Sequence, residues 1–229
     1  MVRGVIFDLD DTLYAYEPAN RAGEEAIAVY AQEMFHLSPG QFLTAYAQGR
    51  AATKQMLPDS GAAHSRLLYV QHTLEILGLT TFPYAYIMEE IFWDAFLAQI
   101  ELFDGALTLF RKLCDRNMKI AICTDLTAAI QYRKIERLGL NPFVNFLVTS
   151  EEVGHEKPHP GIFQMALRKM RLEPREVLMI GDQWEKDIQG AKNLGIKALW
   201  FKPQGDKPKV KAWFRNYHEG KAEEWCGIR

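Results

Sequence analysis

The sequence predicts an α/β fold, in which helices join the strands of a parallel β-sheet and an all-helical insert follows the first strand. From about residue 103 onward, short apolar runs alternate with segments of helical spacing, a pattern typical of βαβ units. Residues 15–100 carry helical patterns and no convincing strand. A chain of 229 residues, 48% of them hydrophobic, is long enough to bury the core of one such domain with an insertion.

The chain opens with an expected strand at residues 3–8, because the apolar run at 5–7 is typical of a buried strand. Asp8 and Asp10 follow at its end, where open α/β sheets bind their ligands and where acids do not belong to a core. Two carboxylates at this spacing can hold a cation, attack a substrate and move a proton. The alternative is an acidic turn capped by Thr12.

The insert comes next, at residues 15–100. Apolar side chains repeat at helical spacing in three of its segments, at 27–34, 67–77 and 88–95. Turn signals at 38–40 and 57–61 separate the helical segments. Because the insert leaves and returns at the end of the first strand, we expect it to lie over the carboxyl edge of the sheet.

Four more strands are expected after the insert, at residues 119–124, 146–149, 177–181 and 196–201, which makes five core strands. Gly139 and Gly195 stand where helices would end. The tail from Lys202 holds more Lys and Arg than Asp and Glu, so we expect it to be solvated and partly ordered, with a phosphate-attracting rim as the alternative. Its Trp213 and Trp225 would bury at a dimer interface or against the insert.

Composition and charge indicate which kinds of partner and which compartment the protein has. A net charge of −2 argues against a dedicated nucleic-acid binder, and no apolar stretch approaches the roughly 18 residues of a membrane span. The first residues lack the pattern of a signal peptide. The three cysteines are not in CxxC spacing and fit a reducing compartment. We therefore expect a cytoplasmic monomer or homodimer that binds neither nucleic acid nor membrane.

Polar side chains also follow the later strands. The second strand runs into Thr124 and Asp125, the third is followed by Lys157, and the fourth runs into Asp182, with Asp187 five residues on. A phosphoryl group needs this set, since hydrogen-bond donors and a cation bind its oxygens while carboxylates hold Mg²⁺. Solvated loops do not account for four strand ends that each carry a suitable polar group.

These motifs resemble those of the haloacid dehalogenase superfamily, whose members are hydrolases with an aspartate nucleophile. The resemblance spans residues 3–201 and rests on four motifs in order: DLDDTL at residues 8–13, Thr124, Lys157-Pro158, and Gly181-Asp182 with Asp187. It implies a Rossmann-like core with helices on both faces, formed by residues 1–14 and 101–229. It also implies that residues 15–100 are a helical cap domain that closes over the substrate.

The resemblance further implies a role for each motif residue. Asp8 would be the nucleophile that forms an aspartyl-phosphate, and Asp10 would protonate the leaving oxygen and then accept a proton from water. Mg²⁺ would be held by the side chain of Asp8, the backbone carbonyl of Asp10 and the carboxylate of Asp182. Lys157 would bind the phosphate and neutralise its charge. Thr124 and the amide of Asp125 would also bind the phosphate. Asp187 would order Lys157 or a metal-bound water.

Asp10 favours phosphoester chemistry, because a halide leaves without a proton and the family's dehalogenases lack an acid at that position. We therefore expect a Mg²⁺-dependent phosphatase that acts on a small phosphorylated metabolite. Two alternatives stay open. One is a phosphosugar mutase of the β-phosphoglucomutase kind, and the other is a non-catalytic module that binds a phosphorylated ligand.

Asp125 departs from the family pattern, in which Asn is frequent, and we expect it to cap the helix that starts near Thr127. His159 is expected to support a turn, and His64 and His72 to lie on the cap surface. The pattern does not tell which cap residues face the substrate among Tyr16, Arg21, Arg50, Lys54 and Gln55. Arg50 and Lys54 share a helical face that is either a solvated basic stripe or a contact for an anionic substrate.

Overall fold

A parallel sheet forms the core of the structure, a computed structural model that describes residues 1–206 and 208–228. The strand order is β3-β2-β1-β4-β5-β6, and each neighbouring pair is parallel. The strands are β1 (Gly4–Phe7), β2 (Lys119–Thr124), β3 (Phe146–Thr149), β4 (Val177–Gly181), β5 (Lys197–Phe201) and β6 (Trp213–Phe214). This arrangement confirms the predicted α/β fold, and it places β1, which ends at the acidic motif, in the middle of the sheet.

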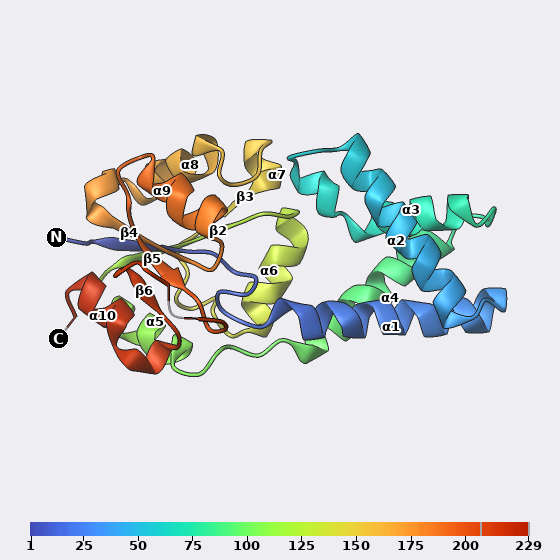
Figure 1. The fold of residues 1–229 in the computed structure, drawn as a ribbon, viewed down its shortest axis with the longest axis horizontal. Coiled ribbons are helices and arrows are strands. Elements are labelled where there is room, and N and C mark those ends of the chain that lie inside the picture. Colours follow the sequence, from blue (N-terminus) through green and yellow to red (C-terminus); the bar gives the residue numbers. More distant parts are fainter. Residues whose placement is uncertain (207, 229) are drawn as a thin grey trace.

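Helices cover both faces of the sheet (Figure 1). They are α5 (Ala106–Asp115), α6 (Ala128–Arg137), α7 (Ser150–Val153), α8 (Pro160–Met170), α9 (Gly190–Lys192) and α10 (Lys221–Cys226). Successive side chains of β1 point to opposite faces, so Phe7 packs in one apolar cluster with Phe110 of α5, and Ile6 packs in the other with Phe163 of α8. Short 3₁₀ turns η2 (Pro174–Glu176) and η4 (Tyr217–Glu219) and a π-helical turn η3 (Trp184–Gln189) complete the core.

The four long helices between β1 and α5 form the cap domain, which lies beyond the carboxyl ends of the strands (Figure 1). They are α1 (Tyr16–Phe35), α2 (Pro39–Met56), α3 (Arg66–Ile76) and α4 (Tyr84–Gln99), with a 3₁₀ turn η1 (Gly61–His64) before α3. Helix α1 packs on α4 and α2 packs on α3. The predicted turn at 38–40 is a capping box, in which Ser38 and Gln41 bond each other's backbone amides as α2 begins.

The tail is more ordered than predicted, because several of its aromatic side chains pack on the core. Trp213 and Phe214 form β6, a sixth strand that two residues are too short to reveal in the sequence. The rings of Phe214 and Tyr217 lie 5.0 and 5.1 Å from that of Phe201, and the Tyr217 hydroxyl donates to the Thr12 carbonyl at 2.8 Å. Trp225 packs against the main apolar cluster. The predicted solvated, partly ordered tail therefore holds for exposed stretches such as 203–206, and it fails for Phe214 and Tyr217, which bury against β5.

The structure also bears on the expectation about membranes. Within residues 1–206 and 208–228, no helix combines the length and the apolar character that a membrane span requires.

Candidate active site

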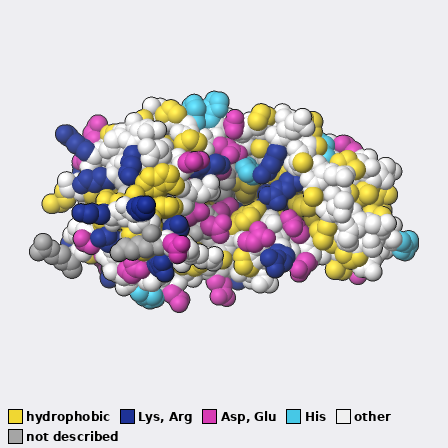
Figure 2. Space-filling view, viewed as in Figure 1, with side chains coloured by type: hydrophobic (Ala, Val, Ile, Leu, Met, Phe, Trp, Pro, Cys, Tyr) yellow, Lys and Arg dark blue, Asp and Glu magenta, His cyan; other side chains and the backbone are white. Residues whose placement is uncertain are grey.

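A cavity lies between the carboxyl ends of the strands and the cap. Its core side is lined by Asp8, Asp10, Asp11, Thr124, Asp125, Leu126, Lys157, Gln183 and Lys186, and its cap side by Tyr16, Arg50, His64 and Arg66. Figure 2 shows acidic, basic and histidine side chains together where the surface is hollowed between core and cap. Candidate site residues from four strand ends thus share one cavity or lie directly behind it.

Lys157 joins two buried carboxylates below the cavity. Its Nζ donates to Asp8 Oδ1 at 2.5 Å and to the Cys123 carbonyl at 3.1 Å. The same Nζ lies 2.8 Å from Asp187 Oδ1, a close ionic contact outside hydrogen-bond angles. Burial would lower the pKa of Lys157, but the charges of Asp187 and Asp8 raise it well above its usual value. Lys157 is therefore a fixed positive charge beside Asp8.

Gly181 allows the close approach of Asp187. A Cβ at Gly181 would lie 2.5 Å from the Asp187 side chain, so a larger residue at the end of β4 would displace that carboxylate. Asp187 Oδ2 accepts the amide hydrogen of Gln183 at 2.9 Å, and the side chain is fully buried. One oxygen of Asp187 is thus hydrogen-bonded and the other contacts the Lys157 ammonium, which suits a residue that orders Lys157.

Thr12 links the remaining two acids. Its hydroxyl lies 2.9 Å from Asp8 Oδ2 and 3.1 Å from Asp182 Oδ1, and a hydroxyl can donate to only one of them at a time. Burial and the charge of Asp187 raise the pKa of Asp182 to about 6. Three carboxylates therefore face a single lysine in this part of the site, which leaves an excess of negative charge.

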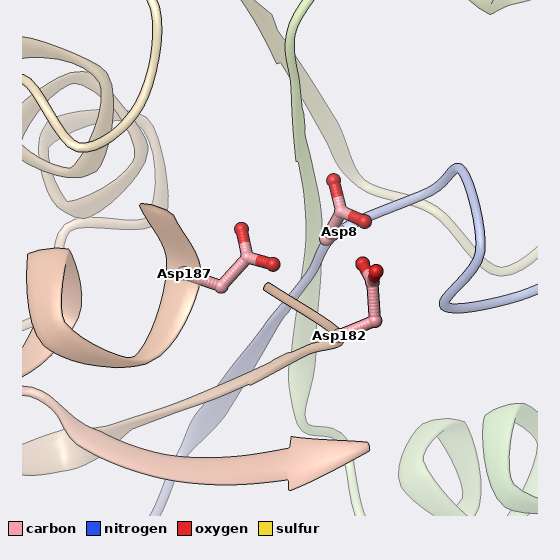
Figure 3. A group of neighbouring side chains, drawn as sticks. All are labelled: Asp8, Asp182 and Asp187. Carbon is pink, nitrogen blue, oxygen red and sulfur yellow. The ribbon is translucent and has the colours of Figure 1, made fainter. Parts of the chain in front are cut away.

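This acidic group fits a hard divalent cation. Asp8, Asp182 and Asp187 each place a carboxylate oxygen within 4.8 Å of the others, and their side chains converge from three elements (Figure 3). Oxygen ligands and excess negative charge suit Mg²⁺ better than zinc. Because Asp187 already contacts Lys157 and the Gln183 amide, Asp8 and Asp182 are the better candidates for direct ligands. Asp10 was expected to hold the metal through its backbone carbonyl, and its carboxylate is bonded to other groups.

Asp10 is held by a lysine that the sequence analysis missed. Lys134 Nζ, from α6, donates to both Asp10 oxygens at 2.9 and 3.0 Å, and the Tyr14 hydroxyl donates to Oδ1 at 2.5 Å. Lys134 is fully buried, and its Nζ lies 5.1 Å from the ring centre of Phe96 and 5.8 Å from that of Trp93, both in the cap. Burial lowers the pKa of Lys134, although Asp10 opposes this effect. This pair links the core to the cap.

Thr124 is also positioned from α6. The side-chain amide of Gln131 donates to Thr124 Oγ1 at 2.6 Å and to the Asp125 carbonyl at 3.2 Å. Gln131 and Lys134 stand among the apolar residues Ile130 and Ile135 on the buried face of α6. Polar residues on the core face of an amphipathic helix were the signal that could have identified both.

The predicted capping role of Asp125 is wrong. Thr127 is the N-cap of α6, and the amide of Ala128 donates to Glu151 rather than to Asp125. Asp125 instead accepts from the Lys157 amide and from Lys186 Nζ, both at 2.9 Å. The ammonium of Lys186, a residue absent from the sequence prediction, balances the charge of this carboxylate.

His64 also differs from its prediction, because it binds the core. Its Nε2 lies 2.6 Å from Glu156 Oε1, and Lys186 donates to the other Glu156 oxygen at 2.9 Å. Burial would raise the pKa of Glu156, but the hydrogen bonds from His64 and Lys186 lower it to about 2. His72 bonds Thr53 inside the cap at 2.7 Å, so neither histidine is a free surface group. His159 accepts the Gly161 amide at the start of α8, as a turn-supporting residue would.

The five cap residues whose orientation the sequence left open divide into two groups. Tyr16 and Arg50 line the cavity, whereas Arg21, Lys54 and Gln55 are exposed and lie outside its lining. The reading of Arg50 and Lys54 as one solvated stripe is therefore wrong for Arg50. Arg66, a fully buried residue on the same wall, had no signal in the sequence pattern.

Comparisons with known proteins agree with this geometry. A family model described as haloacid dehalogenase-like hydrolase matches residues 2–195. Ribulose-1,5-bisphosphate 5-phosphatase of Halopiger xanaduensis is 35% identical over 225 residues, which cover 97% of this chain and 94% of that protein. Glyceraldehyde 3-phosphate phosphatase of Pyrococcus abyssi is 30% identical over 207 residues, which cover 88% and 82%.

Solved structures show the same fold. The crystal structure of a 2-haloacid dehalogenase from Pseudomonas syringae has a TM-score of 0.80 at 24% identity and covers 98% of this chain and 100% of its own. That of a phosphatase from Thermococcus onnurineus has a TM-score of 0.73 at 21% identity, with coverages of 97% and 98%.

Proposed function

The chain belongs to the haloacid dehalogenase-like hydrolase family, and on this premise we propose that it is a Mg²⁺-dependent phosphatase that hydrolyses phosphomonoesters of small phosphorylated metabolites. The observation that carries the proposal is that Asp8 and Asp10 line one cavity, the first paired with Lys157 and the second with Lys134. The names of the two curated relatives support a phosphorylated sugar as the substrate class.

In the first step, a carboxylate oxygen of Asp8 attacks the substrate phosphorus. The ester P–O bond breaks, and the leaving oxygen takes a proton from the carboxylic acid of Asp10. Lys157 keeps Asp8 oriented and offsets part of the phosphate charge. The Thr124 hydroxyl, itself held by Gln131, donates to a phosphoryl oxygen.

In the second step, water attacks the phosphorus of the aspartyl-phosphate and gives its proton to the Asp10 carboxylate. The bond between phosphorus and the Asp8 oxygen breaks, which releases inorganic phosphate and restores both acids. Asp8 and Asp182 would hold Mg²⁺, which would supply the positive charge that lets a carboxylate approach a phosphate dianion. Lys134 and Tyr14 position Asp10 for both proton transfers.

Phosphate release from ribulose 5-phosphate and glyceraldehyde 3-phosphate, with and without Mg²⁺, tests the proposal. We expect release that requires Mg²⁺, and its loss in Asp8→Asn because an amide cannot form the intermediate. Asp104→Asn, at an exposed residue outside the cavity lining, is the matched control. Circular dichroism should show both variants folded.

The same assay separates the alternatives. A mutase would yield an isomeric sugar phosphate without free phosphate, and a binding module would yield neither product. Full activity in Asp8→Asn would contradict the covalent mechanism.

A further inference from the structure

Arg66 is a buried cation whose protein partners are all uncharged. Its side chain lies at the start of α3 and the residue is 3% exposed. One terminal nitrogen donates to the His64 carbonyl at 2.8 Å, and the other donates to the Tyr16 hydroxyl and to Asn20 Oδ1. Its Nε has no hydrogen-bond partner within residues 1–206 and 208–228. No Asp or Glu in these ranges forms an ion pair with it.

Such a charge is costly for the protein alone. Burying an ion without a counterion costs several kcal/mol, which hydrogen bonds to neutral oxygens only partly offset. The guanidinium carbon lies 5.3, 5.1 and 5.0 Å from the ring centres of Tyr69, Phe92 and Trp93, and these contacts recover a further part. An anion bound beside the guanidinium would remove the remaining cost.

A second arginine shares this environment. Arg50, half-buried on α2, lines the same cavity wall as Arg66, and it also lacks an ion pair among the described residues. The opposite wall carries Asp8 and Thr124, where the reacting phosphate would lie. Figure 2 shows basic side chains on the cap side of the hollow, while acidic side chains border it on the core side and along its lower edge. A small molecule bound at Asp8 therefore extends toward two unpaired arginines.

We propose that Arg66 and Arg50 bind a second anionic group of the substrate, so that the preferred substrates are phosphomonoesters with an additional phosphate or carboxylate. Guanidinium groups present paired donors that match the oxygens of both anions. This inference rests on the proposed phosphatase function, and it adds the chemistry of the part of the substrate that does not react.

Two matched substrate pairs test the inference. Ribulose 1,5-bisphosphate and ribulose 5-phosphate differ in one phosphate, and 3-phosphoglycerate and glyceraldehyde 3-phosphate differ in a carboxylate. We expect the member with the second anionic group to have a kcat/KM about 10- to 100-fold higher in at least one pair, the range of a charge-assisted hydrogen bond. The pair that shows the preference tells whether the cap binds phosphate or carboxylate.

Variants of cap residues test whether the two arginines cause the preference for a second anionic group. Arg50→Gln and Arg66→Met should each reduce the kcat/KM ratio of the favoured pair about tenfold or more. Lys54→Gln is the control, because Lys54 follows Arg50 by one helical turn on α2 but is exposed and outside the cavity lining. A ratio that Lys54→Gln lowers as much as Arg50→Gln would overturn the assignment. Should Arg66→Met fail to fold, Arg50→Gln decides alone.

Failure of the inference can be distinguished from failure of the phosphatase function. Phosphate release from all four compounds at equal kcat/KM would overturn the inference and leave the function intact. Release from none would contradict the function. In that case, calorimetry still tests the second-anion site. We expect ribulose 1,5-bisphosphate to bind Asp8→Asn about tenfold more tightly than the double variant that also carries Arg50→Gln. Unchanged binding would overturn the second-anion site.

Discussion

At the core end of the cavity, three lysines contact carboxylates, whereas at the cap end two arginines do not. Lys157 contacts Asp8 and Asp187, Lys134 contacts Asp10, and Lys186 contacts Asp125 and Glu156. Arg50 and Arg66 form no ion pair in the described part of the chain. The core charges are thus fixed before a substrate binds, while the cap charges depend on a ligand for their counterion.

This difference separates two requirements of the proposed reaction. Transition-state stabilisation needs charges that do not reorganise, and a network of mutually paired groups provides them. Recognition of the remaining part of a substrate needs charges that are not already paired. The two ends should therefore respond differently when a cation is removed, in stability as well as in activity.

Lys157→Met should give the largest effect. The substitution leaves Asp8 and Asp187 buried without a cation, and breaking a buried ion pair by removing one partner costs about 3–5 kcal/mol. Urea unfolding at pH 7, in buffer without divalent cations, measures the loss. Lys192→Met, at a residue exposed on α9 and outside the cavity lining, is the control. A loss no greater than that of the control would mean that Lys157 does not balance the buried acids.

Lys134→Met should give the second largest effect, mainly on kcat. Asp10 keeps the Tyr14 hydroxyl as a partner and is still partly exposed, so we expect a moderate loss of stability of about 1–3 kcal/mol. Without Lys134 the carboxylate loses two of its three hydrogen bonds, which should lower kcat and shift its pH profile while KM changes little. A variant with a changed KM and an unaltered pH profile would show that Lys134 acts only through packing. Lys134→Arg should restore part of the activity.

The sequence predicted the residues at the core end of the cavity better than those at its cap end. The lysine and acids of the core end follow apolar strands, and the carboxyl ends of parallel strands meet at one edge, so Asp8, Lys157 and Asp182 could be brought together without coordinates. Lys134 escaped because it lies in the middle of a helix. Only its position between apolar residues that face the sheet marks it as buried.

The cap gave no comparable signal. Helical periodicity shows which residues share a face, but it does not tell which face meets the core. Arg66 is buried because α1, α3 and α4 place Tyr16, Tyr69 and Phe92 around it, and these contacts depend on how the helices pack. The contact between His64 and Glu156 joins residues that are 92 positions apart, which no local pattern encodes.

Glu156→Gln tests the contact between the core and the cap, because Glu156 belongs to the core and bonds His64 of the cap. Hydrogen bonds from His64 and Lys186 lower the pKa of Glu156 from its usual 4.5 to about 2 in the folded protein. A lowered folded pKa gives stability that is present above the unfolded value and is lost as pH falls from about 4.5 toward about 2. The variant should therefore lose less stability than the parent between pH 5 and about pH 3, as urea unfolding would show.

The control for this titration is Glu185→Gln, since Glu185 is exposed and has no ion pair among the residues that the structure describes. It should follow the parent protein at every pH. If Glu156→Gln also followed the parent, the hydrogen bonds that join His64 and Lys186 to this carboxylate would contribute nothing to holding the cap against the core.

Arg66→Met should give the smallest change in stability, although the residue is as buried as Lys157. Removing this cation leaves no carboxylate without a partner, and methionine fills a similar apolar space between Tyr69, Phe92 and Trp93. The relief of an unpaired buried charge should offset the lost hydrogen bonds, so we expect a change within about 1 kcal/mol. Urea unfolding in the absence of substrate provides the measurement. A loss as large as that of Lys157→Met would mean that Arg66 has a counterion within the protein, and the distinction between a paired core end and an unpaired cap end would then fail.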